Sequence, residues 1–292
     1  MNTFEFHDMT LTFLEGNQTL IDGGKYFGPV PRVVWGRKMP YDEKNRVSQT
    51  VDPILIQYKD HNILVDAGHG NSKLTAKQIR NEEIYSENFT LDSLKKLGLT
   101  GENIDIILVT HMHNDHIGGL SRKTESGDIV KNYPDAKIYI NDIEWKEATE
   151  PNKRTQGTYL KDNWQPIEDQ VILFNDSIKI MENIEMHHMG GHSNGISNII
   201  LSQNDEKMIH VSDNFITHWH NNPLYVTGID DYPMDTIAAK EKWLTEAFEK
   251  GYYFFFYHDP YYTVIQYEPD GKTMRYSQRR EKEALVPWDG EE

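Results

Sequence analysis

Four side chains that can bind metal lie within six residues of this 292-residue chain, in the run His111-Met112-His113-Asn114-Asp115-His116. The apolar segment Ile104 to Val109 before the run is typical of a buried strand, so the run begins where that strand ends. Residues two apart in an extended chain share a face, so the His111 and His113 imidazoles can bind a single ion. Asp115 and His116 follow after the chain turns, which supplies an oxygen and a nitrogen for a second ion. The two ions of dinuclear catalytic sites lie ~3.5–4 Å apart.

Two ions need more ligands than these four side chains supply, and three further candidates follow at turns. His192 follows Gly190-Gly191, where glycine lets the backbone bend close to a metal. Asp213 follows an apolar strand, and a carboxylate can bridge two ions with its two oxygens. His258 ends an aromatic strand. His187 and His188 compete with His192, but no flexible glycines precede them, and we prefer His192.

The elements that must position these side chains are predicted from apolar patterning. We expect strands over Met9–Leu14, Pro53–Tyr58, Asn62–Asp66, Ile104–Val109, Lys137–Ile140, Ile178–Met186, Ile196–Leu201, Lys207–Val211 and Tyr252–Tyr257. Helices are predicted over Leu91–Leu97 and from about Asp235 to Lys250. Ligands and chemistry collect beyond the carboxyl ends of strands in layered α/β folds. Asp66 and His69, also at a strand end, are candidates for orienting the metal-bound histidines.

The composition narrows the classes of partner and the chemistry. The formal net charge of -16 disfavours nucleic acid and anionic membranes and favours a small-molecule substrate. The chain has no cysteine, so a metal must be held by nitrogen and oxygen. The acidic N-terminus does not resemble a signal peptide, and no run of ~20 apolar residues is present, so we expect a cytoplasmic protein.

The metal-binding run has the HxHxDH signature and resembles the metallo-β-lactamase superfamily. Gly191-His192-Ser193, Asp213 and His258 follow in that superfamily's order and spacing, and the resemblance covers nearly the whole chain. Within the superfamily the chain is most similar to the quorum-quenching lactonases, especially those of the YtnP type. Their distinctive segments are matched by Asp22-Gly23-Gly24, Phe27-Gly28-Pro29-Val30-Pro31, Trp35, Thr217 to Pro223, and Asp230 to Asp235.

The resemblance implies an αβ/βα sandwich, an α/β fold of two mixed β-sheets flanked by helices, as one hydrolase domain over residues 1–292. It implies that His111, His113 and His192 hold one ion, that Asp115, His116 and His258 hold the other, and that Asp213 bridges them. Zinc is the first expectation, although iron, manganese and cobalt suit the same nitrogen and oxygen ligands. A homodimer is also implied by resemblance.

Sequence differences between this chain and particular members of the superfamily narrow the range of possible substrates. Thiolate-using β-lactamases are excluded because cysteine is absent, and cysteine-free β-lactamases lack a bridging carboxylate where Asp213 stands. Flavin-partnered di-iron relatives replace one of these histidines with an acid. Many acyl-homoserine lactonases carry a tyrosine three residues after the bridging aspartate, where this chain has Ile216. That difference raises the resemblance to the organophosphate hydrolases of the superfamily.

These observations predict a dinuclear-metal hydrolase that opens acyl-homoserine lactones through attack by a metal-bridging hydroxide. Asp115 and His218 are the candidate catalytic residues, for proton transfer to the departing alkoxide and for hydrogen bonding to the substrate. Phe27, Trp35 and Phe215 are candidates for an apolar wall around an acyl chain, with ordinary core packing as the alternative. The same metal site would also suit an organophosphate or carboxylic ester hydrolase. A non-catalytic metal-binding or nucleic-acid module is a third hypothesis.

Overall fold

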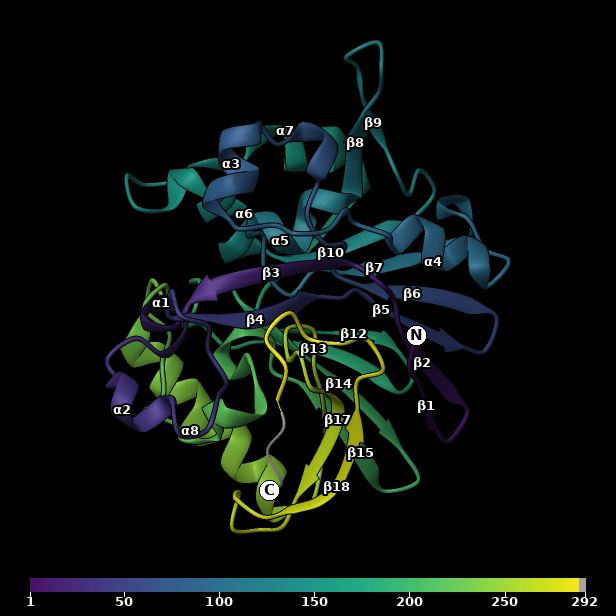
Figure 1. Ribbon diagram of the computed structural model, residues 1–292. Helices are drawn as coiled ribbons and strands as arrows, with labels where there is room; N and C mark the ends of the chain where they lie inside the picture. The colour runs from purple at the N-terminus through teal and green to yellow at the C-terminus, as the bar shows by residue number, and fades with distance from the viewer. Residues whose placement is uncertain (289–292) are drawn as a thin grey trace. The chain divides into compact units, whose positions relative to one another are not determined.

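Each half of the chain carries one mixed β-sheet in the computed structural model, which describes residues 1–288 (Figure 1). The first unit comprises Met1–Asn17 and Val51–Ser177, and the second comprises Gln18–Thr50 and the chain from Ile178 onward. The second unit therefore takes one segment from near the N-terminus and one from the C-terminal half. Both units lie within the single hydrolase domain that we predict.

The sheet of the first unit has the strand order β1-β2-β5-β6-β7-β10-β11. Its first four strands pair antiparallel, while β6, β7, β10 and β11 pair parallel. The strands are β1 (Thr3–Phe6), β2 (Met9–Phe13), β5 (Ile54–Tyr58), β6 (His61–Val65), β7 (Ile106–Leu108), β10 (Lys137–Asn141) and β11 (Val171–Phe174). The parallel strands β6 and β7 end side by side, and the metal-binding run follows β7.

Short helices accompany this sheet, and their apolar side chains share its core. Leu94 of α4 and Ala148 of α6 lie in one buried cluster with Leu64, Ile107 and Ile138 of the strands. The helices are α3 (Ala76–Asn81), α4 (Thr90–Lys96), α5 (Asn114–Ile117), α6 (Asp142–Thr149) and α7 (Lys161–Trp164), with short 3-10 turns at Asn71–Lys73, Gly101–Asn103, Gly118–Leu120, Thr155–Gly157 and Gln165–Gln170. A small hairpin is formed by β8 (Ser121–Lys123) and β9 (Ile129–Lys131).

The sheet of the second unit runs in chain order from β12 to β18, with β15 and β16 parallel. Its strands are β12 (Ser177–Met181), β13 (Ile184–His188), β14 (Ser197–Gln203), β15 (Glu206–His210), β16 (Tyr253–Phe255), β17 (Tyr262–Tyr267) and β18 (Met274–Arg279). A two-stranded sheet of β3 (Asn17–Asp22) and β4 (Arg46–Val51) and the helices α1 (Gly23–Phe27) and α2 (Arg32–Trp35) come from the N-terminal segment.

The long helix α8 (Pro233–Glu249) connects the parallel strands β15 and β16, and its apolar face is buried on this sheet. Trp243, Leu244 and Phe248 of the helix share a cluster with Ile209 and Phe254 of the strands. Proline at the start of the helix suits the first turn, where its missing N–H has no partner to lose. The predicted helix from Asp235 to Lys250 is thus confirmed with its start two residues earlier.

The α/β class and the two mixed sheets with their helices are confirmed. The prediction of one continuous strand over Ile178–Met186 is wrong. A turn at Glu182-Asn183 divides this segment into β12 and β13. Both turn residues are polar, and asparagine favours turns. No helix within residues 1–288 has the length and apolar character needed to cross a membrane.

Candidate metal centre

The loop after β7 brings the metal-binding run of the first unit together. The ring centroids of His111 and His113 lie 4.6 Å apart, and those of His111 and His116 lie 3.9 Å apart. Asp115 lies in the first turn of α5, with its Oδ2 atom 3.8 Å from His116 Nε2. The three imidazoles are buried. The predicted convergence of these four side chains is therefore present within the first unit.

Asp66, at the end of β6, anchors this loop. His116 Nδ1 lies 2.8 Å from Asp66 Oδ2, and Thr110 donates to the same carboxylate through its backbone N–H at 2.9 Å and its hydroxyl at 2.7 Å. Asp66 has a left-handed backbone with φ 52°, which turns its side chain into the loop. The predicted contact of Asp66 with a ligand histidine is confirmed, whereas His69 lies beside Asn114 in the run, 3.3 Å from its side-chain nitrogen.

A second anchor of the same loop was not predicted from the sequence. The buried carboxylate of Glu144 accepts hydrogen bonds from the backbone N–H of Met112 at 2.7 Å and from the Tyr159 hydroxyl at 3.0 Å. Met112 lies between the two predicted ligands His111 and His113, so Glu144 fixes the backbone that carries both. An acidic residue in the first turn of a helix has no spacing signal that points to a loop 32 residues away.

In the second unit, two glycines shape the turn that carries His192. Gly190 and Gly191 have φ of 71° and 124°, conformations that side-chain-bearing residues rarely adopt. Asn214 holds the turn from both sides, because its amide donates to the Gly190 carbonyl and its oxygen accepts from His192 N–H, each at 2.9 Å. The glycine-dependent bend expected from the sequence is present.

Asp213 lies between two of the predicted histidine ligands in the second unit. One carboxylate oxygen, Oδ2, lies 3.5 Å from His192 Nε2, and the other, Oδ1, lies 3.3 Å from His258 Nε2. All three side chains are buried. A carboxylate with a different imidazole nitrogen beside each oxygen has the geometry that bridging of two ions requires.

The hydrogen-bond partners of the histidine Nδ1 atoms indicate whether these residues fit metal ions. His116 Nδ1 and His192 Nδ1 each lie 2.8 Å from a carboxylate, that of Asp66 and that of Asp230 respectively. His258 Nδ1 lies 2.7 Å from the Thr50 carbonyl oxygen. Metal-binding histidines usually donate their other ring nitrogen to such acceptors, which leaves Nε2 for the metal. The donor set, all nitrogen and oxygen, fits divalent ions such as zinc, iron, manganese and cobalt.

Asp230 is buried, yet it stays ionised. Burial raises the pKa of this carboxyl, but hydrogen bonds from His192 and Thr227 outweigh that effect and leave the pKa below its usual value. The fully buried Lys240 of α8 lies near this carboxylate, and its amine donates to the Tyr225 carbonyl at 2.7 Å. Burial lowers the pKa of Lys240 to about 7, against an opposing attraction to Asp230.

His218, a candidate catalytic residue, is buried and paired with Asp259. Its Nδ1 lies 2.5 Å from Asp259 Oδ2, and its backbone N–H donates to the same oxygen at 2.8 Å. The ring packs against Trp219 and Tyr262, with centroids 3.8 Å and 4.8 Å away, and its Nε2 has no hydrogen-bond partner within the described residues. A substrate contact for His218 stays a prediction, as does proton transfer by Asp115.

The three predicted pocket residues lie in two different apolar clusters of the second unit. Phe27 and Trp35 stack with centroids 4.9 Å apart, in the cluster that also holds Ile216. Phe215 packs instead against Phe254, on the side of α8. All of these side chains are at most 2% exposed. A common wall around an acyl chain stays a prediction.

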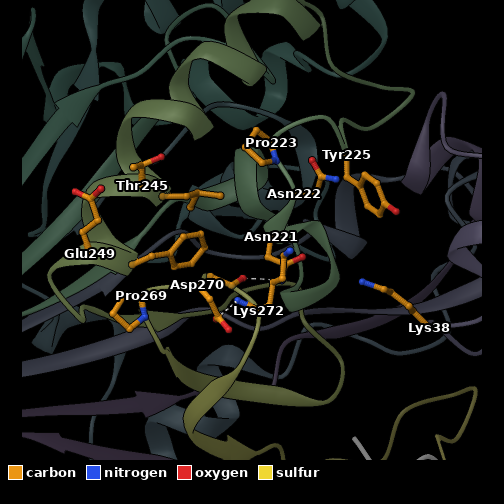
Figure 2. A pocket seen from close by; sticks show the side chains of 13 residues that line it. Lys38, Asn221, Asn222, Pro223, Tyr225, Thr245, Glu249, Pro269, Asp270 and Lys272 are labelled. Atoms are coloured by element: carbon orange, nitrogen blue, oxygen red, sulfur yellow. Dashed lines mark hydrogen bonds between the residues drawn. The ribbon is translucent and has the colours of Figure 1, made fainter.

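A cavity of about 600 Å³ opens in the second unit beside the C-terminal half of α8 (Figure 2). The view in Figure 2 shows Lys38 and Tyr225 at one side and Thr245 and Glu249 at the other. Its lining residues are Lys38, Asn221, Asn222, Pro223, Tyr225, Leu244, Thr245, Phe248, Glu249, Pro269, Asp270, Gly271 and Lys272. Neither the predicted ligands nor the predicted pocket residues are among them.

The rejected histidines have other partners. His188 Nε2 lies 2.8 Å from the Asn194 carbonyl oxygen, and His187 Nε2 lies 3.2 Å from Glu185 on the same strand. These contacts agree with the preference for His192.

Comparison with known proteins places this site in a family. The sequence pattern of the metallo-beta-lactamase superfamily matches residues 50–218, which include the whole metal-binding run, His192 and Asp213. A probable metal-dependent hydrolase from Staphylococcus aureus is 36% identical, with a TM-score of 0.91 over 96% of this chain and 99% of that one.

More distant matches share the fold. AidC, a dizinc quorum-quenching lactonase solved with a product, N-hexanoyl-L-homoserine, is 17% identical, with a TM-score of 0.76 over 100% of this chain and 98% of AidC. A ribonuclease Z from Clostridium kluyveri is 33% identical over 85 residues, which cover 29% of this chain and only 20% of that enzyme. On the superfamily match and the close Staphylococcus aureus relative, the chain belongs to the metallo-beta-lactamase superfamily.

Proposed function

We propose that this metal-dependent hydrolase opens the lactone ring of acyl-homoserine lactones and so acts in quorum quenching. The observation that carries the proposal is Asp213, with one carboxylate oxygen beside His192 Nε2 and the other beside His258 Nε2. That geometry suits a bridging ligand of two ions, which distinguishes lactonases from cysteine-free β-lactamases. The dizinc lactonase AidC, which has the same fold, supports the same assignment.

The proposed ligands divide between two divalent ions, with zinc as the first candidate. His111, His113 and His192 would hold one ion. Asp115, His116 and His258 would hold the other, and Asp213 would be a ligand of both. When bound, the ions supply a water of lowered pKa and polarise the carbonyl group under attack. Three of the five proposed histidine ligands have a hydrogen-bond acceptor beside Nδ1, which favours the neutral tautomer that presents Nε2 to a metal.

The chain's own residues would then handle the substrate. Asp115 would pass a proton to the departing alkoxide, and His218 would donate or accept a hydrogen bond through Nε2. Asp259 holds the opposite nitrogen of the His218 ring, which fixes the orientation of that imidazole. Phe27, Trp35 and Phe215 remain the proposed apolar contacts of the acyl chain.

A carboxylic ester or phosphotriester is the second candidate substrate, and Ile216 favours it. Ile216 is 2% exposed, in the cluster of Phe27 and Trp35, so it leaves no hydroxyl where many acyl-homoserine lactonases have a tyrosine. Phosphodiester cleavage of RNA is disfavoured, since a net charge of -16 repels a polyanion. We further propose a cytoplasmic location and a homodimer.

A rate comparison on one panel tests these alternatives. The zinc-loaded protein is assayed on N-hexanoyl-L-homoserine lactone, an aryl ester and a phosphotriester, with Asp213→Ala as the matched inactive control. We expect the lactone to be hydrolysed fastest, with the acyl chain retained in the product. Lactone rates no better than those of Asp213→Ala, with ester or phosphotriester turnover intact, would replace the first candidate by the second.

A further inference from the structure

The imidazole of His258 is held by Thr50, a residue 208 positions earlier in the chain. His258 Nδ1 lies 2.7 Å from the Thr50 carbonyl oxygen, and the Thr50 N–H donates to the His258 carbonyl oxygen at 3.2 Å. Both residues belong to the second unit and both are buried. Strand β4, which contains Thr50, therefore bonds both the ring and the backbone of a proposed ligand.

The Thr50 hydroxyl lies within hydrogen-bond distance of the residues on either side of His258. It lies 3.1 Å from the Tyr257 carbonyl oxygen and 3.2 Å from the Asp259 carbonyl oxygen, so its single hydrogen can be donated to either. The guanidinium of Arg280 bonds nearby carbonyls from β18's end, that of Phe256 at 3.1 Å and that of Asp259 at 2.8 Å. The loop that carries His258 is thus bonded from two separate segments.

The Thr50 contact also decides which nitrogen of His258 is available. A backbone carbonyl only accepts hydrogen bonds, so the ring proton must be on Nδ1 for this contact to form. The amide nitrogen of Gln49 lies 3.0 Å from the same Nδ1, but an amide nitrogen only donates and cannot bond Nδ1 in this tautomer. Nε2 is then the unprotonated nitrogen, and it lies 3.3 Å from Asp213 Oδ1.

We infer that Thr50 is a positioning residue for His258: its carbonyl oxygen holds the imidazole in the tautomer that a metal ligand needs, and its hydroxyl fixes the backbone on either side of that residue. The inference rests on the metal-binding part of the proposed function. Partners that orient a ligand in this way typically change metal affinity by about 10–100-fold when they are removed. Holding the ring before the ion arrives also removes the entropy cost of ordering it during binding.

Thr50→Val tests the inference, because it removes the hydroxyl and keeps the shape and the backbone contacts. Zinc-loaded protein is titrated with a chelator while zinc release is followed, and the cobalt-loaded protein is examined by visible absorption. We expect Thr50→Val to bind one of its two zinc ions roughly 10-fold more weakly than the wild type. We also expect the visible absorption bands of the cobalt-loaded variant to shift. Thr50→Ser, which retains the hydroxyl, should restore both properties.

The matched control is Thr263→Val, a buried threonine in β17 whose hydroxyl bonds Gln278 and not the His258 loop. Zinc retention and cobalt bands of Thr50→Val identical to those of Thr263→Val would overturn the inference. Should Thr50→Val fail to fold, Thr50→Ala removes the same hydroxyl, and unchanged zinc retention there would also overturn the inference. A wild-type protein that holds two ions but hydrolyses no lactone would overturn the proposed substrate alone.

Discussion

His192 donates from Nδ1 to Asp230 Oδ1 over 2.8 Å, and this bond leaves Nε2 as the nitrogen that faces Asp213. The same carboxylate accepts a hydrogen bond from the Thr227 hydroxyl at 2.6 Å, which fixes the position of the Asp230 side chain beside the His192 imidazole. Asp230 begins the segment Asp230 to Asp235, which resembles the matching segment of the quorum-quenching lactonases. Its position here gives that segment a physical role, since it orients a proposed ligand.

Asp230→Asn removes the charge that holds the His192 proton and nearly preserves the shape of the side chain. We expect metal affinity to fall by about 10–100-fold, measured by competition with a chelator. Asp42→Asn is the matched control, because it breaks an ion pair with Arg46 away from the proposed ligands. Equal metal affinity in the two variants would show that Asp230 does not orient His192.

Lys240 predicts a pH dependence of stability. Burial lowers its pKa from 10.5 to about 7, so between these values the unfolded chain carries a proton that the folded protein lacks. The contribution of Lys240 to the free energy of unfolding therefore rises with pH across that window, and the cost of burying the cation is complete below about pH 7.

Urea unfolding of the wild type and of Lys240→Met between pH 7 and 10 measures this effect. The difference in unfolding free energy, wild type minus variant, should increase by up to about 1.4 kcal/mol per pH unit. Tyrosines and other titrating groups are the same in both proteins and cancel in the difference. A constant difference over this range would mean that Lys240 titrates normally in the folded protein.

Gly191→Ala should weaken both the fold and the proposed site. An added Cβ would lie 2.6 Å from Asn214 Oδ1 and 2.8 Å from the Thr236 Cα, at a φ of 124°. The expected destabilisation is about 1–3 kcal/mol from the backbone conformation alone, and metal affinity should fall because His192 follows directly. Gly157→Ala is the control, since its Cβ would meet nothing within 4 Å. Thermal unfolding of the two variants side by side checks the prediction.

Metal removal should abolish hydrolysis without unfolding the protein's sheets. Dialysis against a chelator is expected to eliminate activity, and added zinc, manganese, cobalt or iron(II) should restore it to different extents. Circular dichroism before and after dialysis separates loss of metal from loss of fold. Hydrolysis that persists in protein shown to be free of metal would rule out the proposed chemistry.

Local patterns in the sequence predict the candidate ligands, because His111, His192, Asp213 and His258 each follow a strand or a glycine turn. The partners that orient them were harder to predict. Thr50 and His258 are 208 residues apart, and no spacing or periodicity links β4 to that loop. Asp66 was predicted because it also ends a strand beside the run, whereas Glu144 lies inside a helix.

The apolar candidates show a second limit of sequence analysis. Phe27, Trp35 and Phe215 are all large and near proposed site segments, yet Phe215 packs on the side of α8 and the other two stack elsewhere. A large aromatic residue in the sequence can be buried in a core or can contact a substrate. The residue type alone does not distinguish these two roles. The prediction of a single strand over Ile178–Met186 is wrong because the polar turn at Glu182-Asn183 interrupts a segment that is otherwise rich in isoleucine and methionine.

The metal content of the purified protein shows whether the seven proposed ligands bind two divalent ions. Elemental analysis of wild-type protein loaded with zinc should give two ions per chain, and Asp213→Ala should give fewer, because both ions lose a shared ligand. One ion or none in folded wild-type protein, or an unchanged content in Asp213→Ala, would contradict it.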